Sequence, residues 1–455
     1  MKSRIDTFVA IITWLGVTCI GALAMAQSPS SGLQSFEPVP PGFRPLFDSA
    51  KGTEGWHARP HFDPNKLAAM SEEVRDQKLN EWMTEAAKHW RVEGDELIND
   101  GEGPYLVTND EFRDYELIID YATVPMADSG IYLKANPQVQ IWDYTRVDRF
   151  ELGSDLGSGG LWNNPAGSKG KDPLVLADRS FGQWNRFFIR QIGSRTTVYL
   201  NGRLVVDHAI MNNYWQKDQP FPVRGPIALQ THGGEIRWRN LAIRELSPDE
   251  SASILLEHER QRFSSVFDGE TLDGWIGNTG SYEVANGAIR CIEGQGGNLL
   301  SEDIYQNFQW RLMFQLPPGG NNGLAIRMPT PKPDGKRDDP AYQGMCELQV
   351  LDNPHPKYTS IDDRQRHGSA YAMVPAKTGY LRPAGQWNFQ EVTVDGSTVS
   401  VELNGTRILD ADLSRVTEFM NDRPHPGKDR TEGHIGFAGH NDPVEYRELW
   451  IRRLP

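Results

Sequence analysis

The chain has 455 residues, of which 38% are hydrophobic, 10% aromatic and 24% charged, with 44 glycines and 30 prolines. This composition is typical of a globular protein with more than one domain, and it excludes a coiled coil, a multi-span membrane protein and a wholly disordered chain. The formal net charge of −14 argues against a nucleic-acid partner, because such binding depends on Lys and Arg side chains that neutralise phosphates.

The N-terminal residues have the order of a secretory signal. Lys2 and Arg4 precede an uncharged, largely apolar stretch that closes on Ala24-Met25-Ala26. We predict a signal peptide at 1–26, cleavage after Ala26 and export to the periplasm or the medium. A retained membrane anchor is the alternative, because the stretch approaches the length of a membrane span. Residues 27–35 are predicted to be a disordered lead-in, and no other membrane association is expected.

One domain has been duplicated. Gly182-Gln183-Trp184-Asn185 recurs as Gly385-Gln386-Trp387-Asn388, and Asn201-Gly202 recurs at the same spacing as Asn404-Gly405. We predict a first copy at 36–246 and a second copy at 263–455. Residues 247–262 are the predicted linker, where Ser247-Pro248-Asp249-Glu250 combines an N-cap, a first-turn proline and a capping-box glutamate.

Each copy has the pattern of antiparallel β structure. Short alternating segments are bounded by Gly, Pro or Asn, and both Asn-Gly pairs fit two-residue hairpin turns. The clearest of these segments are Tyr115 to Tyr121, Gly130 to Lys134, Val139 to Trp142, Thr196 to Leu200, Gln309 to Gln315, Leu348 to Leu351 and Ser400 to Leu403. We predict a mostly β protein with two tandem sandwiches or jelly rolls. A helical insertion at about 64–90, opened by Asp63-Pro64, decorates the first copy only, and its apolar stripe is interpreted as packing.

The ordered motifs of the two copies resemble the 3-keto-disaccharide hydrolase family, also known as domain of unknown function 1080. The first copy carries Asp128 to Lys134, Gln138 to Asp143, Gly159 to Trp162, Trp184-Asn185, Asn201-Gly202 and Leu229 to His232. The second carries Asn322 to Arg327, Glu347 to Asp352, His367 to Tyr371, Trp387-Asn388, Asn404-Gly405 and Gly439-His440. The resemblance implies a concanavalin A-like sandwich that binds a small carbohydrate, and cleavage of glycosides whose ring is oxidised at carbon 3.

The second copy is the predicted catalyst. A keto group at carbon 3 acidifies the hydrogen on carbon 2, so a base can remove that hydrogen while the carbon 1 substituent leaves. We expect Glu347 or His440 to be the base, because Glu347 and Gln349 lie at alternate positions that share one face of a strand. Arg327, Gln349 and His367 are expected to hold the enolate or the ring hydroxyls.

Further sugar contacts are expected from both copies. These substrate-binding candidates are Gln349, Asp352 and Tyr371 in the second copy, and Lys134, Gln138, Gln140, Trp142, Asp143, Trp162 and His232 in the first. Gln138 stands where the family pattern has a glutamate, which removes an ionisable group from the first copy. Trp142, Trp162 and Tyr371 are the candidates for stacking on a sugar ring, whereas Trp184 and Trp387 are expected to anchor the cores.

Structural explanations remain open for the same residues. Glu347 is alternatively a charged residue on a solvated strand face, and Arg327 alternatively pairs with Asp352. His440 and His232 precede late turns, so they alternatively hydrogen-bond only backbone. These alternatives keep a second function open, in which one or both sandwiches bind carbohydrate without cleaving it.

Cofactor binding has little support in the sequence. The resemblance allows a divalent metal ion, but the chain holds no EF-hand spacing and no HExxH. Loop carboxylates that could serve as ligands are Asp338, Asp339, Asp362 and Asp363. Outside the predicted signal, Cys291 and Cys346 are the remaining cysteines; they are not in a metal-binding spacing, and we interpret both as structural.

Overall fold

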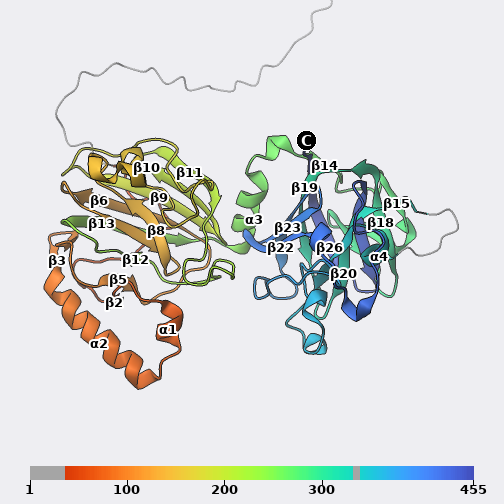
Figure 1. Ribbon diagram of the computed structural model, residues 1–455, viewed down its shortest axis with the longest axis horizontal. Coiled ribbons are helices and arrows are strands. Elements are labelled where there is room, and N and C mark those ends of the chain that lie inside the picture. The colour runs from red at the N-terminus through yellow and green to blue at the C-terminus, as the bar shows by residue number, and fades with distance from the viewer. Residues whose placement is uncertain (1–35, 332–338) are drawn as a thin grey trace, which may run out of the picture. The chain divides into compact units, whose positions relative to one another are not determined.

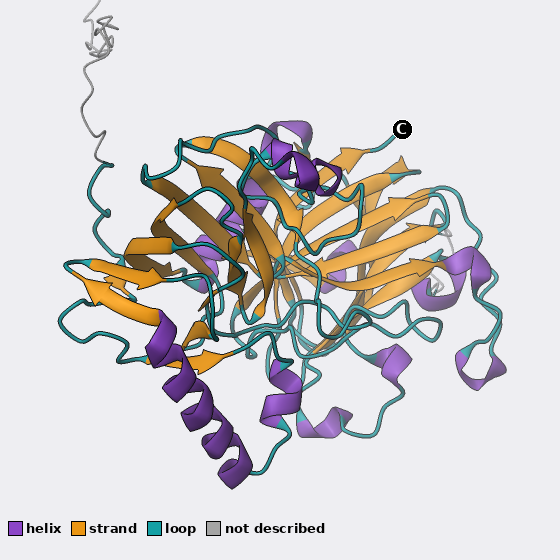
Figure 2. Ribbon diagram, turned by 60° about the vertical axis from the view of Figure 1, so that its left-hand side comes forward, coloured by secondary structure: helices purple, strands orange, loops and turns teal. Residues whose placement is uncertain are grey.

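Antiparallel strands make up the two copies in the computed structural model, which describes residues 36–331 and 339–455 (Figures 1 and 2). The predicted signal peptide and lead-in lie outside the described residues. Residues 38–455 form one compact unit. Each copy pairs one eight-stranded sheet with one five-stranded sheet, so the prediction of a mostly β protein with two tandem sandwiches is confirmed.

In the first copy, the eight-stranded sheet has the order β11-β10-β9-β6-β13-β4-β3, with β1 paired to β13, and the five-stranded sheet has the order β2-β5-β12-β7-β8. The strands are β1 (Arg44–Pro45), β2 (Trp56–Arg59), β3 (Trp90–Glu93), β4 (Glu96–Asn99), β5 (Tyr105–Thr108), β6 (Tyr115–Thr123), β7 (Ser129–Leu133), β8 (Asn136–Ile141), β9 (Asn185–Ile192), β10 (Arg195–Leu200), β11 (Arg203–Ile210), β12 (Ala228–Leu229) and β13 (Ile236–Glu245).

The second copy repeats this topology. Its eight-stranded sheet has the order β16-β17-β26-β19-β22-β23-β24, with β14 paired to β26, and its five-stranded sheet has the order β15-β18-β25-β20-β21. The strands are β14 (Ser264–Ser265), β15 (Trp275–Gly277), β16 (Tyr282–Ala285), β17 (Ala288–Cys291), β18 (Gly296–Tyr305), β19 (Phe308–Gln315), β20 (Asn321–Met328), β21 (Cys346–Leu351), β22 (Trp387–Asp395), β23 (Thr398–Leu403), β24 (Thr406–Asp412), β25 (Gly433–His440) and β26 (Glu445–Arg453).

Both predicted Asn-Gly hairpins are present. Asn201 and Gly202 join β10 to β11, and Asn404 and Gly405 join β23 to β24. All four residues have positive φ, at 53°, 80°, 51° and 79°. A two-residue turn needs these values to match the right-handed twist of the strands, and Asn and Gly adopt them at the least cost.

Each core lies between the two sheets of its copy, because one face of every strand is apolar. Trp238 of β13 and Trp310 of β19 are fully buried in the first and second cores, respectively. Cys291 and Cys346 are buried thiols of the second core. We call the face of each five-stranded sheet that points away from the core its outer face, and the candidate sites lie there.

Two predictions about hydrophobic packing need correction. Trp184 and Trp387 do not anchor the two main cores: each ring is half-buried beneath an arginine, with the guanidinium carbons of Arg239 and Arg447 each 4.0 Å from the ring centroids, and Trp387 packs only against a smaller hydrophobic cluster. Both tryptophans begin a strand at the sheet margin, so a cation–π contact covers them where the core does not reach.

The helical segments lie at the margins of the sandwiches. They are α1 (Pro64–Ala68), α2 (Glu72–His89), α3 (Pro248–Glu257) and α4 (Pro340–Gln343), with 3-10 turns at Val147–Leu152, Ser154–Leu156, Arg260–Arg262, Thr279–Ser281, Pro356–Tyr358, Asp363–Gln365, Leu413–Arg415 and Met420–Asp422. The capping box predicted at Ser247 and Glu250 is present at the start of α3.

The helix predicted at 64–90 is two helices. The backbone is extended at Ser71 (φ −61°, ψ 152°), and α2 starts from there. Its apolar stripe packs only in part, since Ala86 is buried against the first core whereas Val74 is 44% exposed. In Figure 1, α2 extends along the outside of the first copy beside β2 and β3.

The copies meet through two hairpins. The backbone N–H and the hydroxyl of Ser194 donate to the carbonyl oxygen of Gly405 at 3.1 and 2.9 Å. Arg195 donates twice to the buried carboxylate of Glu402, at 2.9 and 2.5 Å. This bidentate pair crosses between the copies and supplies both groups with charge-assisted hydrogen bonds.

Candidate active site

Strand β21 presents a polar face at the edge of the second five-stranded sheet. Cys346, Leu348 and Val350 point into the core, which leaves Glu347 and Gln349 on the outer face. The alternation deduced from sequence is therefore the one observed.

A cavity of about 220 Å³ lies over this face. Its floor comes from β21 and the ends of β20 and β25, and its walls come from α4 and the loops that follow β21. The lining residues are Asn321, Asp339, Ala341, Tyr342, Glu347, Gln349, Leu351, Tyr358, Ile361, Gln365, Tyr371, Arg423 and His440. Four residues proposed from sequence, Glu347, Gln349, Tyr371 and His440, thus converge on one cavity.

The carboxylate and the imidazole of this cavity face each other. Oε1 of Glu347 lies 3.5 Å from Nε2 of His440, which ends β25. The Glu347 side chain is only 4% exposed, whereas that of His440 is 44% exposed. Gly323 of β20 leaves room for the carboxylate, because a Cβ atom there would lie 2.0 Å from Oε1. A buried carboxylate beside a solvent-accessible imidazole is suited to accepting a proton and passing it on.

The other polar groups of the cavity have defined orientations. The amide of Gln349 donates to Oδ1 of Asn321 at 2.6 Å, which holds Gln349 against the neighbouring strand. The hydroxyl of Tyr371 accepts a hydrogen bond from Gln365 at 3.1 Å. This leaves the phenol proton without an acceptor among the described residues, and burial raises the pKa of Tyr371. Tyr371 is thus a hydrogen-bond donor that a ligand can use.

Arg423 supplies the positive charge of the cavity. Its guanidinium carbon lies 3.5 Å from the ring centroid of Tyr342, and Nη2 lies 3.7 Å from Asp339. Sequence reasoning did not select Tyr342 or Arg423, because α4, which carries Tyr342, and the segment that carries Arg423 have no repeated partner in the first copy. Asn321 could have been found, because it aligns with Asp128 when the Ser129-Gly130 and Asn322-Gly323 motifs are superposed.

Three residues proposed from sequence lie away from the cavity: Arg327, Asp352 and His367. Arg327 is 1% exposed, and its guanidinium donates to the backbone carbonyls of Gln306, Gly396 and Arg430. A register shift in β20 and a φ of 50° at Arg327 turn the side chain out of the alternation. It does not pair with Asp352, whose carboxylate accepts the N–H of Gly319 at 2.8 Å.

His367 belongs to the core. Its ring stacks on Phe314, with centroids 5.0 Å apart, and Nδ1 accepts the N–H of Leu351. Burial lowers the pKa of His367 to about 3. The neutral ring therefore packs between the sheets and does not reach the cavity.

The first copy has a corresponding set of polar residues, in which the carboxylate and the amide have changed places. Asp128, which precedes β7, aligns with Asn321, and Gln138 aligns with Glu347. Oδ2 of Asp128 lies 3.1 Å from Nδ1 of His232. The amide of Gln140 donates to Oδ1 of Asp128 at 2.8 Å, and Gln138 donates to Gln140. The first copy therefore has a carboxylate–imidazole pair, and the hydrogen bond that His232 donates to the carboxylate of Asp128 raises the pKa of His232.

Larger side chains fill the outer face of the first copy. The strand registers align Tyr105 with Asn298, and Tyr132 with Ala325. The two tyrosine rings contact each other with centroids 5.3 Å apart. Where the second copy has Asn298 and Ala325, which do not line its cavity, the first copy thus has an aromatic layer.

The remaining candidates of the first copy are held by structural contacts. Lys134 donates to the carbonyl of Gly193 at 3.0 Å, and burial lowers its pKa to about 8. Asp143 accepts the backbone N–H groups of Met126 and Thr145.

The two tryptophans proposed for sugar stacking contact each other. The rings of Trp142 and Trp162 meet edge to face at 5.0 Å. The ammonium of Lys171 lies 3.4 Å from the ring centroid of Trp162 and covers one of its faces.

The described residues do not form a metal site. No group of three or more His, Cys, Asp or Glu is close enough to bind an ion within 36–331 and 339–455. Asp362 and Asp363 are paired with Arg364 and Arg366, and Asp339 caps α4. The donor set therefore does not fit a divalent ion, and we assign no step to one.

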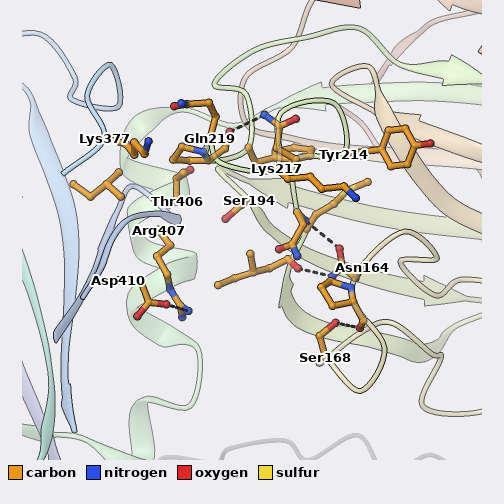
Figure 3. A pocket seen from close by; sticks show the side chains of 18 of the residues that line it. Asn164, Ser168, Ser194, Tyr214, Lys217, Gln219, Lys377, Thr406, Arg407 and Asp410 are labelled. Carbon is orange, nitrogen blue, oxygen red and sulfur yellow. Dashed lines mark hydrogen bonds and ion pairs between the residues drawn. The ribbon is translucent and has the colours of Figure 1, made fainter. Parts of the chain in front are cut away.

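A larger cleft of about 1120 Å³ lies between the copies (Figure 3). Lys217 and Gln219 of the first copy line it, as do Lys377, Arg407 and Asp410 of the second, and Arg407 contacts Asp410 at 3.3 Å. None of the residues proposed from sequence lines this cleft, and no carboxylate–imidazole pair is present among its lining residues.

The model of the 3-keto-alpha-glucoside-1,2-lyase-like domain family matches residues 42–244 and 262–452. The chain belongs to this family. A 3-keto-disaccharide hydrolase of Bacteroides thetaiotaomicron is 26% identical over 246 residues, which are 46% of this chain and 85% of that protein.

Solved structures are similar to parts of this chain. A crystal structure from Parabacteroides distasonis, described as that of a candidate glycosyl hydrolase, is 22% identical and covers 42% of this chain and 99% of that one, with a TM-score of 0.37. The carbohydrate-binding module CBM66 of Bacillus subtilis is 12% identical and covers 39% and 95%, with a TM-score of 0.26. In the described part of the chain, no helix combines the length and apolar character that crossing a bilayer requires.

Proposed function

We propose that the second copy cleaves glycosides whose sugar ring carries a keto group at carbon 3. The observation that carries this proposal is the buried carboxylate of Glu347, 3.5 Å from the imidazole of His440 in a cavity of sugar-ring size. Membership of the 3-keto-glucoside lyase-like family supports the same substrate class.

The chemistry is an elimination. Glu347 accepts the proton from carbon 2, and the C–H electron pair moves to the ketone oxygen as an enolate. When the ketone re-forms, the bond between carbon 1 and the glycosidic oxygen breaks and a double bond forms between carbons 1 and 2. The protonated imidazole of His440 donates to the departing oxygen, so the aglycone leaves as an alcohol. Addition of water to the double bond would complete a hydrolysis.

Tyr371 is the proposed donor to the enolate. Its hydroxyl accepts from Gln365, so its own proton points to another partner. Because burial raises its pKa, the phenol stays protonated at neutral pH. A preoriented donor acts most strongly where charge develops, which is the ketone oxygen in this reaction.

The decisive experiment measures product from a 3-keto-glucoside and from its unoxidised parent. We expect release only from the keto sugar, a primary isotope effect when carbon 2 carries deuterium, and loss of turnover in Glu347→Gln. Asp128→Asn is the matched control, because it removes the corresponding carboxylate of the first copy. Full activity in Glu347→Gln, or loss of activity in Asp128→Asn alone, would contradict the assignment to the second copy.

The first copy is proposed to bind carbohydrate without cleaving it. Gln138 cannot act as a base, and the outer face of the first copy carries the buried rings of Tyr105 and Tyr132 where the second copy has Asn298 and Ala325.

Export of the chain is also proposed, from the charged, apolar and small-residue order of residues 1–26. Fractionation of cells expressing the whole chain should place the protein in the periplasm or the medium, with a mature N-terminus at Gln27. Recovery of an uncleaved chain in the membrane fraction would support the retained anchor.

A further inference from the structure

Arg59 is a buried cation without a counter-charge. It is the last residue of β2, lies on the outer face of the first copy opposite Tyr105, and is 3% exposed. Its Nε has no hydrogen-bond partner. Within 36–331 and 339–455 no carboxylate lies within ion-pair distance of its guanidinium.

Two other buried arginines, Arg311 and Arg327, have partners for several of their donors, whereas the guanidinium of Arg382, which is 5% exposed, donates to the carbonyl of Trp387 and has no ion pair among the described residues. Arg311 donates to Glu391 at 2.6 Å. Arg327, which lacks a carboxylate, is surrounded by backbone carbonyls instead. Taking a guanidinium out of water is costly unless its charge and its N–H donors are satisfied. Arg59 therefore has an unmet requirement for an anion.

Neutral polar groups surround Arg59 on the same face. The hydroxyl of Tyr132 lies 3.0 Å from Nδ1 of His61, and Nε2 of Gln230 lies 3.5 Å from the hydroxyl of Tyr105. Oε1 of Gln230 is buried without a partner. His61 is exposed, and it comes from the segment between β2 and α1, so it forms the solvent side of this cluster.

Asp63, the acidic side chain that acts on Arg59, is already hydrogen-bonded to another residue. Asp63 contributes to the electrostatic field at Arg59, but its carboxylate accepts the N–H and the side-chain amide of Asn65 at 2.9 and 3.0 Å. The charge of Arg59 also affects the pKa values of two nearby histidines. Burial, followed by the charge of Arg59, lowers the pKa of His61, and burial and Arg59 also lower that of His57.

The second copy has no equivalent of this cation. The residue aligned with Arg59 is Asn278, whose amide donates to the carbonyl of Gly296 at 3.2 Å. Asn298 and Ala325 stand at the positions of Tyr105 and Tyr132. The cluster is thus a property of the first copy alone, and it arose as the two copies diverged.

We propose that the first copy binds the oxyanion group of an acidic carbohydrate, with Arg59 as the charged contact and the tyrosine hydroxyls and Gln230 as its neutral partners. A carboxylate or a phosphate on the sugar supplies the missing negative charge and accepts the planar N–H donors of the guanidinium. This site is independent of the reaction proposed for the second copy.

Isothermal titration of the whole protein tests the site with three probes: glucuronate, glucose 6-phosphate and glucose. We expect at least one of the two anions to bind and glucose to bind more weakly. Comparison of glucuronate with glucose 6-phosphate distinguishes a carboxylate from a phosphate as the recognised group. If neither anion binds more tightly than glucose, the proposal is wrong, and this result requires no variant.

Two variants locate the binding. Arg59→Gln should weaken anion binding by about 10- to 100-fold, which is the usual loss when a charged hydrogen bond is removed. Arg423→Gln, which removes the cation of the second cavity, should leave anion binding unchanged. The reverse pattern would place the anion in the second copy and overturn the proposal.

The thermal stability of the variants gives a separate readout. Because Arg59 is buried without a partner, Arg59→Met should not lower the melting temperature of the ligand-free protein, while the stabilisation by the anion should disappear. A marked fall in melting temperature without added anion would show that Arg59 is a satisfied structural residue, contrary to the proposal. Glu347→Gln should keep the anion response even if it abolishes catalysis.

Discussion

Gly323 provides the space that the carboxylate of Glu347 occupies. The two residues lie on neighbouring strands, and a Cβ atom at position 323 would approach Oε1 of Glu347 to 2.0 Å. A side chain at this position would therefore push the carboxylate away from His440 and into the cavity.

Gly323→Ala should reduce kcat by about 100-fold, because a displacement of the base by about 1 Å has effects of that size. The fold should persist, since the strain can be relieved by movement of one side chain. Steady-state kinetics and circular dichroism check both expectations. Gly280→Ala is the matched control, because a Cβ atom there meets nothing within 4 Å. Unchanged kcat in Gly323→Ala would mean that the position of Glu347 is not critical.

Tyr371→Phe should lower kcat by about 10²- to 10³-fold if the phenol holds the enolate, because that is the usual effect of losing one donor to a developing oxyanion. KM should change little, since the interaction is strongest in the transition state. Kinetics on the 3-keto-glucoside give both constants, with Tyr199→Phe in the first copy as a control. A change in KM alone would instead indicate a ground-state contact.

Arg327→Met should destabilise the protein without altering the chemistry. The substitution removes the hydrogen bonds from a buried guanidinium to the carbonyls of Gln306, Gly396 and Arg430, at a cost of about 2–5 kcal/mol. Urea unfolding measures this loss, and kcat per folded molecule should stay close to that of the unmodified protein. If kcat falls by orders of magnitude while the unfolding midpoint is unchanged, the catalytic role inferred from sequence is the correct one.

His367 should make the second copy sensitive to acid. Its pKa is about 3 in the folded protein, below the ordinary value of about 6.5, so the unfolded chain binds the additional proton between these values. Stability is therefore retained above about pH 6.5 and decreases as the pH falls toward 3, by up to about 5 kcal/mol from this group. The comparison is with His367→Gln, which cannot titrate. Identical pH dependence of unfolding in the two proteins would contradict the burial of a neutral imidazole.

Local sequence patterns predicted the strands and turns because their causes are local. The alternation in Glu347 to Leu351 reflects the period of a strand, and the Asn-Gly pairs reflect the positive φ values of a two-residue turn. The same alternation placed Glu347 and Gln349 on one face. Sequence comparison between the copies also identified His440 and His232, since both follow the same strand.

The structure places two of the site residues proposed from sequence away from the outer face, for a physical reason that lies outside any one segment of sequence. Arg327 and Lys134 occupy equivalent positions, with φ values of 50° and 49°, and both donate to the carbonyl of the equivalent glycine of a distant turn, Gly396 and Gly193. An irregularity of strand pairing turns these side chains away from the outer face. A period of two residues along the strand cannot show this.

The sequence by itself determined the duplication, the β class, the hairpins and the face on which the candidate base lies, because these depend on spacing and on the conformational preferences of single residues. Only the tertiary structure decided which polar groups meet. Loops brought Tyr342 and Arg423 over β21, Asp128 took the place of Glu347 as the carboxylate partner in the first copy, and Arg59 was buried without an anion. Such encounters depend on how separate strands and loops pack in space, which no single stretch of sequence specifies.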